Sequence, residues 1–140
     1  GANVSTRIRT QQVGDAASTV SQYPAVREKM VKLQQSLAEH TSVVMDGRDI
    51  ASKVLPNADT KIYLTASVEE RARRRANELR EKGEACDIAE VEAEIRARDD
   101  RDMHRQHSPL IQVPEAVLVD SSTLTIDETI DRILEICMQH

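Results

Sequence analysis

The chain has 140 residues, enough for one ordinary domain that buries a core without disulfides or a metal. Apolar residues make up 39% and charged residues 31% of it, with no Trp, no Phe and two Tyr. The core must therefore be aliphatic, and aromatic platforms for stacking nucleic-acid bases are not expected. The net charge of -5 argues against a surface that attracts nucleic acid as a whole, so any anion site must be local.

The two cysteines, Cys86 and Cys137, are far apart and form no C-x-x-C pair. That usage fits free thiols in a reducing compartment, and we expect a cytoplasmic protein. No apolar run approaches the roughly 18 residues of a membrane span, and no signal-like segment follows the start. We therefore expect neither a membrane nor a nucleic acid as a partner.

Helices and short buried strands are predicted in turn along the chain. Residues 13–23 are expected to be helical or turn-rich, and a helix is predicted to follow Pro24 from the spacing of Val26, Met30, Leu33 and Leu37. Three short continuous apolar runs are typical of parallel strands covered on both faces, and they lie at residues 42–45, 61–65 and 116–119. The sequence therefore predicts an α/β fold with a parallel sheet flanked by helices.

Two of the predicted strands lead into helix starts. Ser67 with Glu70, and Thr125 with Glu128, each match the capping box, in which side chains and backbone amides satisfy one another. The pattern strand, turn, helix is thus repeated.

Residues 87–105 carry one helical stripe that changes from apolar to charged. The apolar part is Ile88, Val91 and Ile95, and the charged part is Arg98, Asp102 and Arg105. An apolar stripe faces the core, so its charged continuation points to a cleft that binds an anion. The alternative is a helix that ends near Arg98, followed by a solvated run of charges.

The tetrapeptide from Asp46 to Asp49, D-G-R-D, follows the first predicted strand, at the end where open α/β sheets bind ligands. Glycine permits a tight turn, and Arg48 offers a planar fork for phosphate. Asp49 can accept from an amino group or orient an arginine. The alternative is a polar turn with an internal ion pair.

A second basic cluster, residues 71–75, opens the helix after the second strand. It could bind polyphosphate, clamp a transferring phosphoryl group or grip a nucleic-acid backbone. The alternative is a solvated face with i,i+4 ion pairs, and the interleaved glutamates weaken the nucleic-acid interpretation. His104 and His107 are spaced for a metal, but no further ligand pattern closes a site, so surface histidines are expected.

Five segments resemble the bacterial cytidylate kinase family in order and spacing. The most specific is R-D-D-R-D-x-x-R from Arg98 to Arg105, followed by S-P-L; the others are 8–10, 24–28, 46–49 and 61–67. The resemblance runs over essentially the whole chain from about Asn3. It implies part of a P-loop nucleoside monophosphate kinase fold, with a parallel sheet, flanking helices and a short mobile lid at about 75–95. Residues 3–40 would complete the monophosphate-binding region, and residues 41–140 would form the C-terminal part of the core.

The resemblance also implies a reaction and a set of roles. These enzymes transfer the γ-phosphoryl group of ATP to CMP or dCMP with Mg²⁺. Ser18, Arg27 and Asp49 would recognise cytosine, and Asp102 and Arg105 would reach the sugar and its surroundings. Arg48 and Arg98 would hold the monophosphate, and Arg71 and Arg74, with Arg98, would serve as catalytic residues that neutralise the transferring phosphoryl group.

Two departures from the family pattern limit these expectations. Residues 50–56 replace the glycine-containing stretch that usually follows D-G-R-D, and no G-x-x-x-x-G-K-[ST] motif occurs in the 140 residues. We therefore expect the chain to be the C-terminal portion of a longer protein, inactive alone and without tightly bound ATP or Mg²⁺. The missing strand would leave a slot in the sheet, which the chain would close, rearrange or fill by association with another copy. The remaining alternatives are a non-catalytic nucleotide- or anion-binding module and an RNA-binding helix at residues 71–75.

Overall fold

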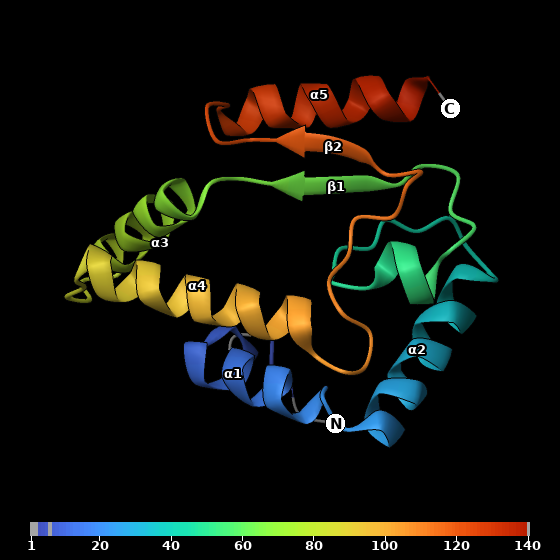
Figure 1. Ribbon diagram of the computed structural model, residues 1–140, viewed down its shortest axis with the longest axis horizontal. Helices are drawn as coiled ribbons and strands as arrows, with labels where there is room; N and C mark the ends of the chain where they lie inside the picture. Colours follow the sequence, from blue (N-terminus) through green and yellow to red (C-terminus); the bar gives the residue numbers. More distant parts are fainter. Residues whose placement is uncertain (1–2, 6, 140) are drawn as a thin grey trace.

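The structure is a computed structural model that describes residues 3–5 and 7–139, and helices dominate it (Figure 1). Its five α-helices within these residues are α1 (Gln11–Val20), α2 (Pro24–Ala38), α3 (Val68–Glu81), α4 (Ile88–His104) and α5 (Ile126–Met138). The strands are β1 (Ile62–Thr65) and β2 (Val117–Asp120), and the short helical turns are η1 (Arg7–Arg9) and η2 (Ile50–Val54). The predicted helices at 24, 68, 88 and 126 are all present, and the α/β prediction is confirmed.

The sheet is parallel but has two strands in the described part of the chain. Ile62 lies opposite Val117, and the register continues to Thr65 opposite Asp120. β1 and β2 lie within one residue of two predicted strands, and α5 packs along β2 (Figure 1). The core is aliphatic as predicted, since the buried apolar residues are all Ala, Val or Ile.

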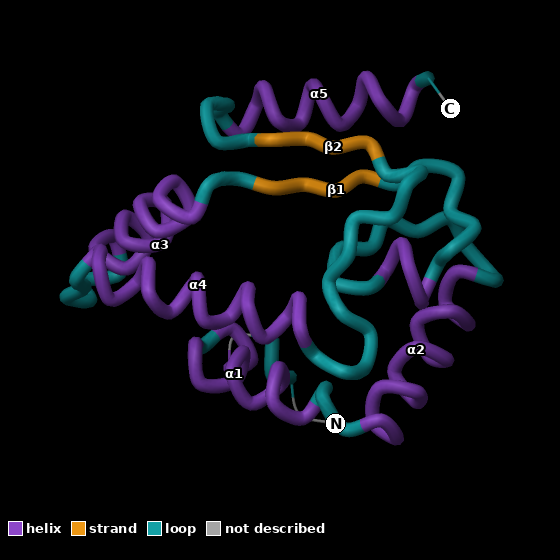
Figure 2. The backbone as a smooth tube through the Cα atoms, viewed as in Figure 1, coloured by secondary structure: helices purple, strands orange, loops and turns teal. Residues whose placement is uncertain are grey.

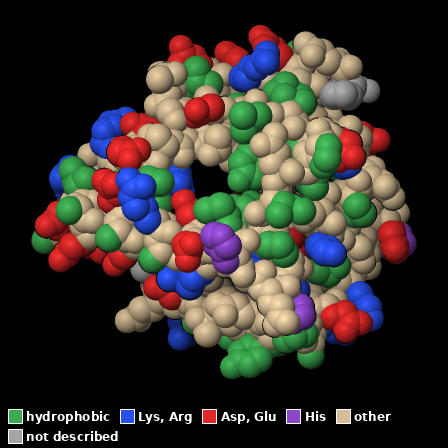
Figure 3. Space-filling model, viewed as in Figure 1, with side chains coloured by type: hydrophobic (Ala, Val, Ile, Leu, Met, Phe, Trp, Pro, Cys, Tyr) green, Lys and Arg blue, Asp and Glu red, His purple; other side chains and the backbone are tan. Residues whose placement is uncertain are grey.

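The prediction of a strand at residues 42–45 is wrong. This segment runs as loop and pairs with neither β1 nor β2, and the Val44 side chain is fully exposed (Figure 2). A strand forms only where a neighbouring backbone satisfies its N–H and C=O groups, and here none lies alongside. The space-filling view shows a hollow between the sheet and α4, bordered by apolar side chains (Figure 3). Within the described residues, β1 has β2 as its one strand neighbour, and the slot expected beside β1 stays a prediction.

α3 and α4 form a hairpin with a tight apolar seam. Ala72 and Ala76 are fully buried in α3, and Val91 is buried in α4. Gly83 ends α3 with a left-handed φ of 76°, and its N–H donates to the Arg80 carbonyl at 2.9 Å. The predicted lid range, residues 75–95, covers the tip of this hairpin, and its role as a lid stays a prediction.

The two predicted capping boxes have different outcomes. The box at α5 is complete, because Thr125 accepts from the Glu128 N–H at 3.2 Å and Glu128 accepts from the Thr125 N–H at 2.8 Å. At α3, Ser67 accepts from the Glu70 N–H at 3.2 Å, but the Glu70 carboxylate binds Arg73 and Arg74 instead of closing the box. Charged donors within reach compete successfully with a backbone amide.

Candidate functional site

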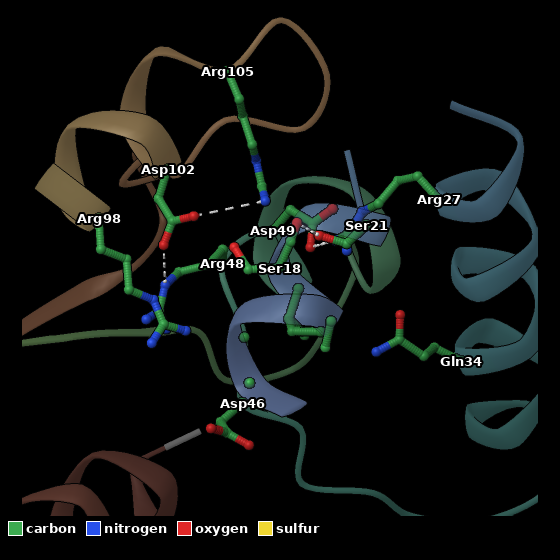
Figure 4. A pocket seen from close by; sticks show the side chains of 14 residues that line it. Ser18, Ser21, Arg27, Gln34, Asp46, Arg48, Asp49, Arg98, Asp102 and Arg105 are labelled. Atoms are coloured by element: carbon green, nitrogen blue, oxygen red, sulfur yellow. Dashed lines mark hydrogen bonds and ion pairs between the residues drawn. The ribbon is translucent and has the colours of Figure 1, made fainter. Parts of the chain in front are cut away.

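One cavity of about 360 Å³ lies between α1, α2, α4 and the D-G-R-D turn (Figure 4). All seven residues predicted to contact substrate line it: Ser18, Arg27, Arg48, Asp49, Arg98, Asp102 and Arg105. The remaining lining residues are Gly14, Ala17, Ser21, Gln34, Asp46, Gly47 and Ile50. Four arginines against three aspartates leave an excess of one positive charge, which suits an anionic ligand.

α4 supplies one wall of the cavity. The predicted inward stripe is confirmed at Val91 and Asp102, which are buried, but not at Ile88, which is exposed. The helix runs to His104, so the alternative of an end near Arg98 is wrong. Asp102 is 6% exposed, as a core-facing position requires, while Arg98 is exposed at the rim. Asp102 accepts from Arg48 Nε at 2.9 Å, and Arg105 Nη1 lies 3.9 Å from its other oxygen.

The D-G-R-D turn supplies the opposite wall. Asp49 is 2% exposed and pairs with Arg27 of α2, while Arg48 pairs with Asp102 of α4. The alternative of an internal ion pair in this turn is therefore wrong, because both charges reach other elements. η2 follows directly, with the Leu55 N–H donating to the Ile50 carbonyl at 2.7 Å, and Gln35 of α2 donates to the carbonyls of Lys53 and Val54.

Three buried polar atoms in this cavity have no hydrogen-bond partner in the described structure. They are Asp49 Oδ2, Arg27 Nε and Arg105 Nη2. Burial, and secondly the charge of Arg105, lower the pKa of Arg27. Buried polar atoms without partners are costly, so this end of the cavity offers two donors and one acceptor that a polar ligand could satisfy.

The cavity thus has two ends with different chemistry. The Asp49 end holds Ser18, Arg27, Asp49 and Arg105, whose polar atoms include both acceptors and donors. The Arg98 end holds Arg48 and Arg98, whose side chains extend toward the same side of the cavity in Figure 4. Arg98 has no hydrogen bond or ion pair within residues 3–5 and 7–139, so its guanidinium is available to a ligand.

Arg71 and Arg74 do not line this cavity. Arg71 binds both carboxylate oxygens of Asp99, at 3.0 and 2.6 Å, and donates from Nε to the Ala66 carbonyl at 3.0 Å. Arg74 binds Glu70 at 2.7 Å and the Ser121 carbonyl at 2.5 Å. Both join α3 to neighbouring elements, and their catalytic role stays a prediction.

Sequence reasoning missed Ser21 and Gln34. A helical signal was available for both, because Ser21, the C-cap residue of α1, lies three residues after Ser18, and Gln34 lies seven residues after Arg27 on one face of α2. The expectation of surface histidines is confirmed, because His104 and His107 are both exposed. Among the described residues there is no group of three His, Cys, Asp or Glu side chains that could hold a metal ion.

A family model described as "Cytidylate kinase" matches residues 1–139. The chain belongs to the cytidylate kinase family. It is 45% identical over 137 residues to a cytidylate kinase of Symbiobacterium thermophilum, covering 98% of this chain and 61% of that protein. It is 48% identical over 136 residues to cytidylate kinases of Desulfitobacterium hafniense and Geobacillus kaustophilus, covering 97% of this chain and 59% and 61% of those proteins.

Cytidylate kinases are nucleoside monophosphate kinases, so the predicted family is confirmed. The chain spans about 60% of the length of the curated relatives it matches. No helix in the part of the chain that the structure describes is both long and apolar enough to cross a bilayer.

The chain carries a pH-dependent ion pair at the start of α3. Hydrogen bonds from Arg73, and then from Arg74, lower the pKa of Glu70 from 4.5 to about 2. A carboxyl whose pKa is lower in the folded chain stabilises the fold fully above its unfolded pKa, and this contribution is lost as the pH falls through its folded pKa. The loss therefore runs from pH 4.5 down to about pH 2.

Replacing Glu70 with glutamine should flatten the fall in unfolding free energy over that pH range, because the titrating group is gone. Urea unfolding at a series of pH values measures this slope. The exposed carboxylate of Glu94 has no hydrogen bond in the described residues, so Glu94→Gln is the matched control and should keep the parent slope. Equal slopes in the parent chain and Glu70→Gln would contradict the assignment.

Proposed function

We propose that the cavity binds cytidine monophosphate, with the base at the Asp49 end and the phosphate at the Arg98 end. The observation that carries this is the buried Asp49 carboxylate, whose Oδ2 has no partner and faces the cavity beside two arginine nitrogens that also lack partners. Cytosine presents an amino donor to such an acceptor. Uracil presents a carbonyl at the same position. The uracil oxygen and Asp49 Oδ2 are both acceptors, so neither would have a donor.

The phosphate would lie where the cavity has free cationic donors. Arg48 uses only Nε on Asp102, so its terminal nitrogens remain for a ligand, and Arg98 is unpaired in the described structure. Planar guanidinium groups bind phosphate oxygens in pairs. Asp102 would hold Arg48 in place and, with Arg105, would line the sugar between the two ends.

In the full-length family protein, this chain would supply the monophosphate site for phosphoryl transfer from ATP to CMP or dCMP. Arg71 and Arg74 would neutralise charge on the transferring phosphoryl group. Arg71 would then have to break its ion pair with Asp99 and bind the phosphoryl group instead. The residues described here do not by themselves fit ATP and Mg²⁺, because they include no G-x-x-x-x-G-K-[ST] loop and no metal-binding cluster. No step through either group is assigned to them.

Calorimetric titration of the 140-residue chain with CMP, UMP and a short RNA tests this proposal. We expect CMP to bind more tightly than UMP. Equal binding of both nucleotides would favour an anion-binding module, and a steep salt dependence with RNA would favour an RNA-binding helix. A phosphorylation assay is the companion experiment: we expect no CMP turnover by this chain alone, and measurable turnover would contradict that expectation.

A further inference from the structure

The segment that follows α4 turns back on the helix and touches two residues of the cavity. The Leu110 N–H donates to the Asp102 carbonyl at 2.8 Å, which closes a short loop over the end of α4. Within that loop, Arg105 Nε donates to the Ser108 carbonyl at 2.5 Å. A residue that lines the cavity is therefore held by a backbone group of a residue that does not line it.

Ser108 has a left-handed backbone conformation, with a φ of 52°, and it is the one residue other than glycine in that region among the described residues. A positive φ is uncommon outside glycine, costs free energy and persists where the surroundings impose it. Here it turns the carbonyl of Ser108 toward the Arg105 side chain. The strained residue thus coincides with the contact that fixes the arginine.

The contact leaves the rest of the Arg105 guanidinium directed into the cavity. Its side chain is 15% exposed, Nη1 lies 3.9 Å from Asp102, and Nη2 is buried without a partner. Figure 4 shows Arg105 extending from the loop toward Asp49. Because Nε is held by the Ser108 carbonyl, the two terminal nitrogens have little freedom to turn away from the cavity.

We propose that Ser108 is a positioning residue, whose left-handed backbone aims its carbonyl at Arg105 Nε and so presents Arg105 Nη2 to the bound ligand. The proposal rests on the proposed function, because the ligand is taken to be CMP. Ser108 need not touch that ligand, and its hydroxyl group has no part in the mechanism. Only its backbone conformation matters.

The matched variants are Ser108→Gly and Ser108→Val. Glycine adopts a positive φ without cost, whereas a β-branched residue is a genuine outlier there. We expect Ser108→Gly to bind CMP like the parent chain and Ser108→Val to bind it on the order of tenfold more weakly, the effect of one hydrogen bond to a charged group. In an Arg105→Ala background, Ser108→Val should cause no further loss, since the residue acts through Arg105.

Hydrogen exchange of the Arg105 Nε–H, followed by NMR, tests the positioning without any nucleotide. Exchange should be slow in the parent chain and in Ser108→Gly, and as fast in Ser108→Val as at Arg101, an exposed arginine of α4 without a hydrogen bond in the described residues. Slow exchange in Ser108→Val, fast exchange in Ser108→Gly, or an equal loss of CMP binding in the Arg105→Ala background would overturn the proposal.

If the valine variant does not fold, the measurement on the parent chain decides. Fast exchange of the Arg105 Nε–H there would rule out its hydrogen bond to the Ser108 carbonyl, and slow exchange would support it. If the parent chain does not bind CMP, the proposed function fails while the exchange data still decide the role of Ser108.

Discussion

Replacing Arg27 with methionine should lower the free energy of unfolding by about 3–5 kcal/mol, because it leaves a buried carboxylate without its partner. Asp49 has a side chain that is 1% exposed, and Arg27 is the residue that pairs with it. Burial removes the water that would otherwise solvate the charge. Urea unfolding followed by circular dichroism measures the change.

Two controls separate this effect from the loss of any positive charge on α2. Lys32→Met breaks an exposed i,i+4 pair with Glu28 on the same helix and should leave the free energy of unfolding nearly unchanged. The double variant Arg27→Met with Asp49→Asn removes the buried charge and should recover much of the loss. A small effect of Arg27→Met alone would show that Asp49 is not a buried charge in solution.

Replacing Arg98 with alanine should weaken CMP binding by about 10- to 100-fold, the range for losing hydrogen bonds to a charged group. Arg98 lines the cavity and has no partner in the described residues, so its removal breaks no internal contact. Binding of cytidine, which carries no phosphate, should change little. Calorimetric titration of both ligands measures the difference.

Arg101→Ala is the matched control, because Arg101 is exposed on the same helix and does not line the cavity. It should bind CMP like the parent chain, with any small difference removed by added salt. An equal loss of cytidine and CMP binding in Arg98→Ala would place the phosphate elsewhere.

The elements that could be predicted are those whose signal lies within their own residues. The stripe in α4 identified both the helix and the buried Asp102, and Thr125 with Glu128 identified the start of α5. The segment 42–45 has an equally good strand signal, but a strand also requires a neighbour, and that information is not local. Ser67 failed as a full capping box for a similar reason, since Arg73 and Arg74 compete for Glu70.

The residues that line the cavity could be predicted, but most of the contacts between them and their neighbours could not. The family resemblance placed seven residues that the structure brings to one cavity. Pairings across long sequence separations were not predictable: Asp99 with Arg71 is an example, as is Asp102 with Arg48. Such contacts depend on how whole helices pack, and short-range spacing carries no information about that.

Side chains of α2 bind the segment from Asp49 to Val54 at two places, which lie eight residues apart on the helix. Arg27 holds Asp49 at one end, and Gln35 holds the carbonyls of Lys53 and Val54 at the other. Two separated attachments restrict rotation of η2 about α2. A displacement of α2 relative to α4 would therefore carry Asp49 with it and would alter the width of the cavity.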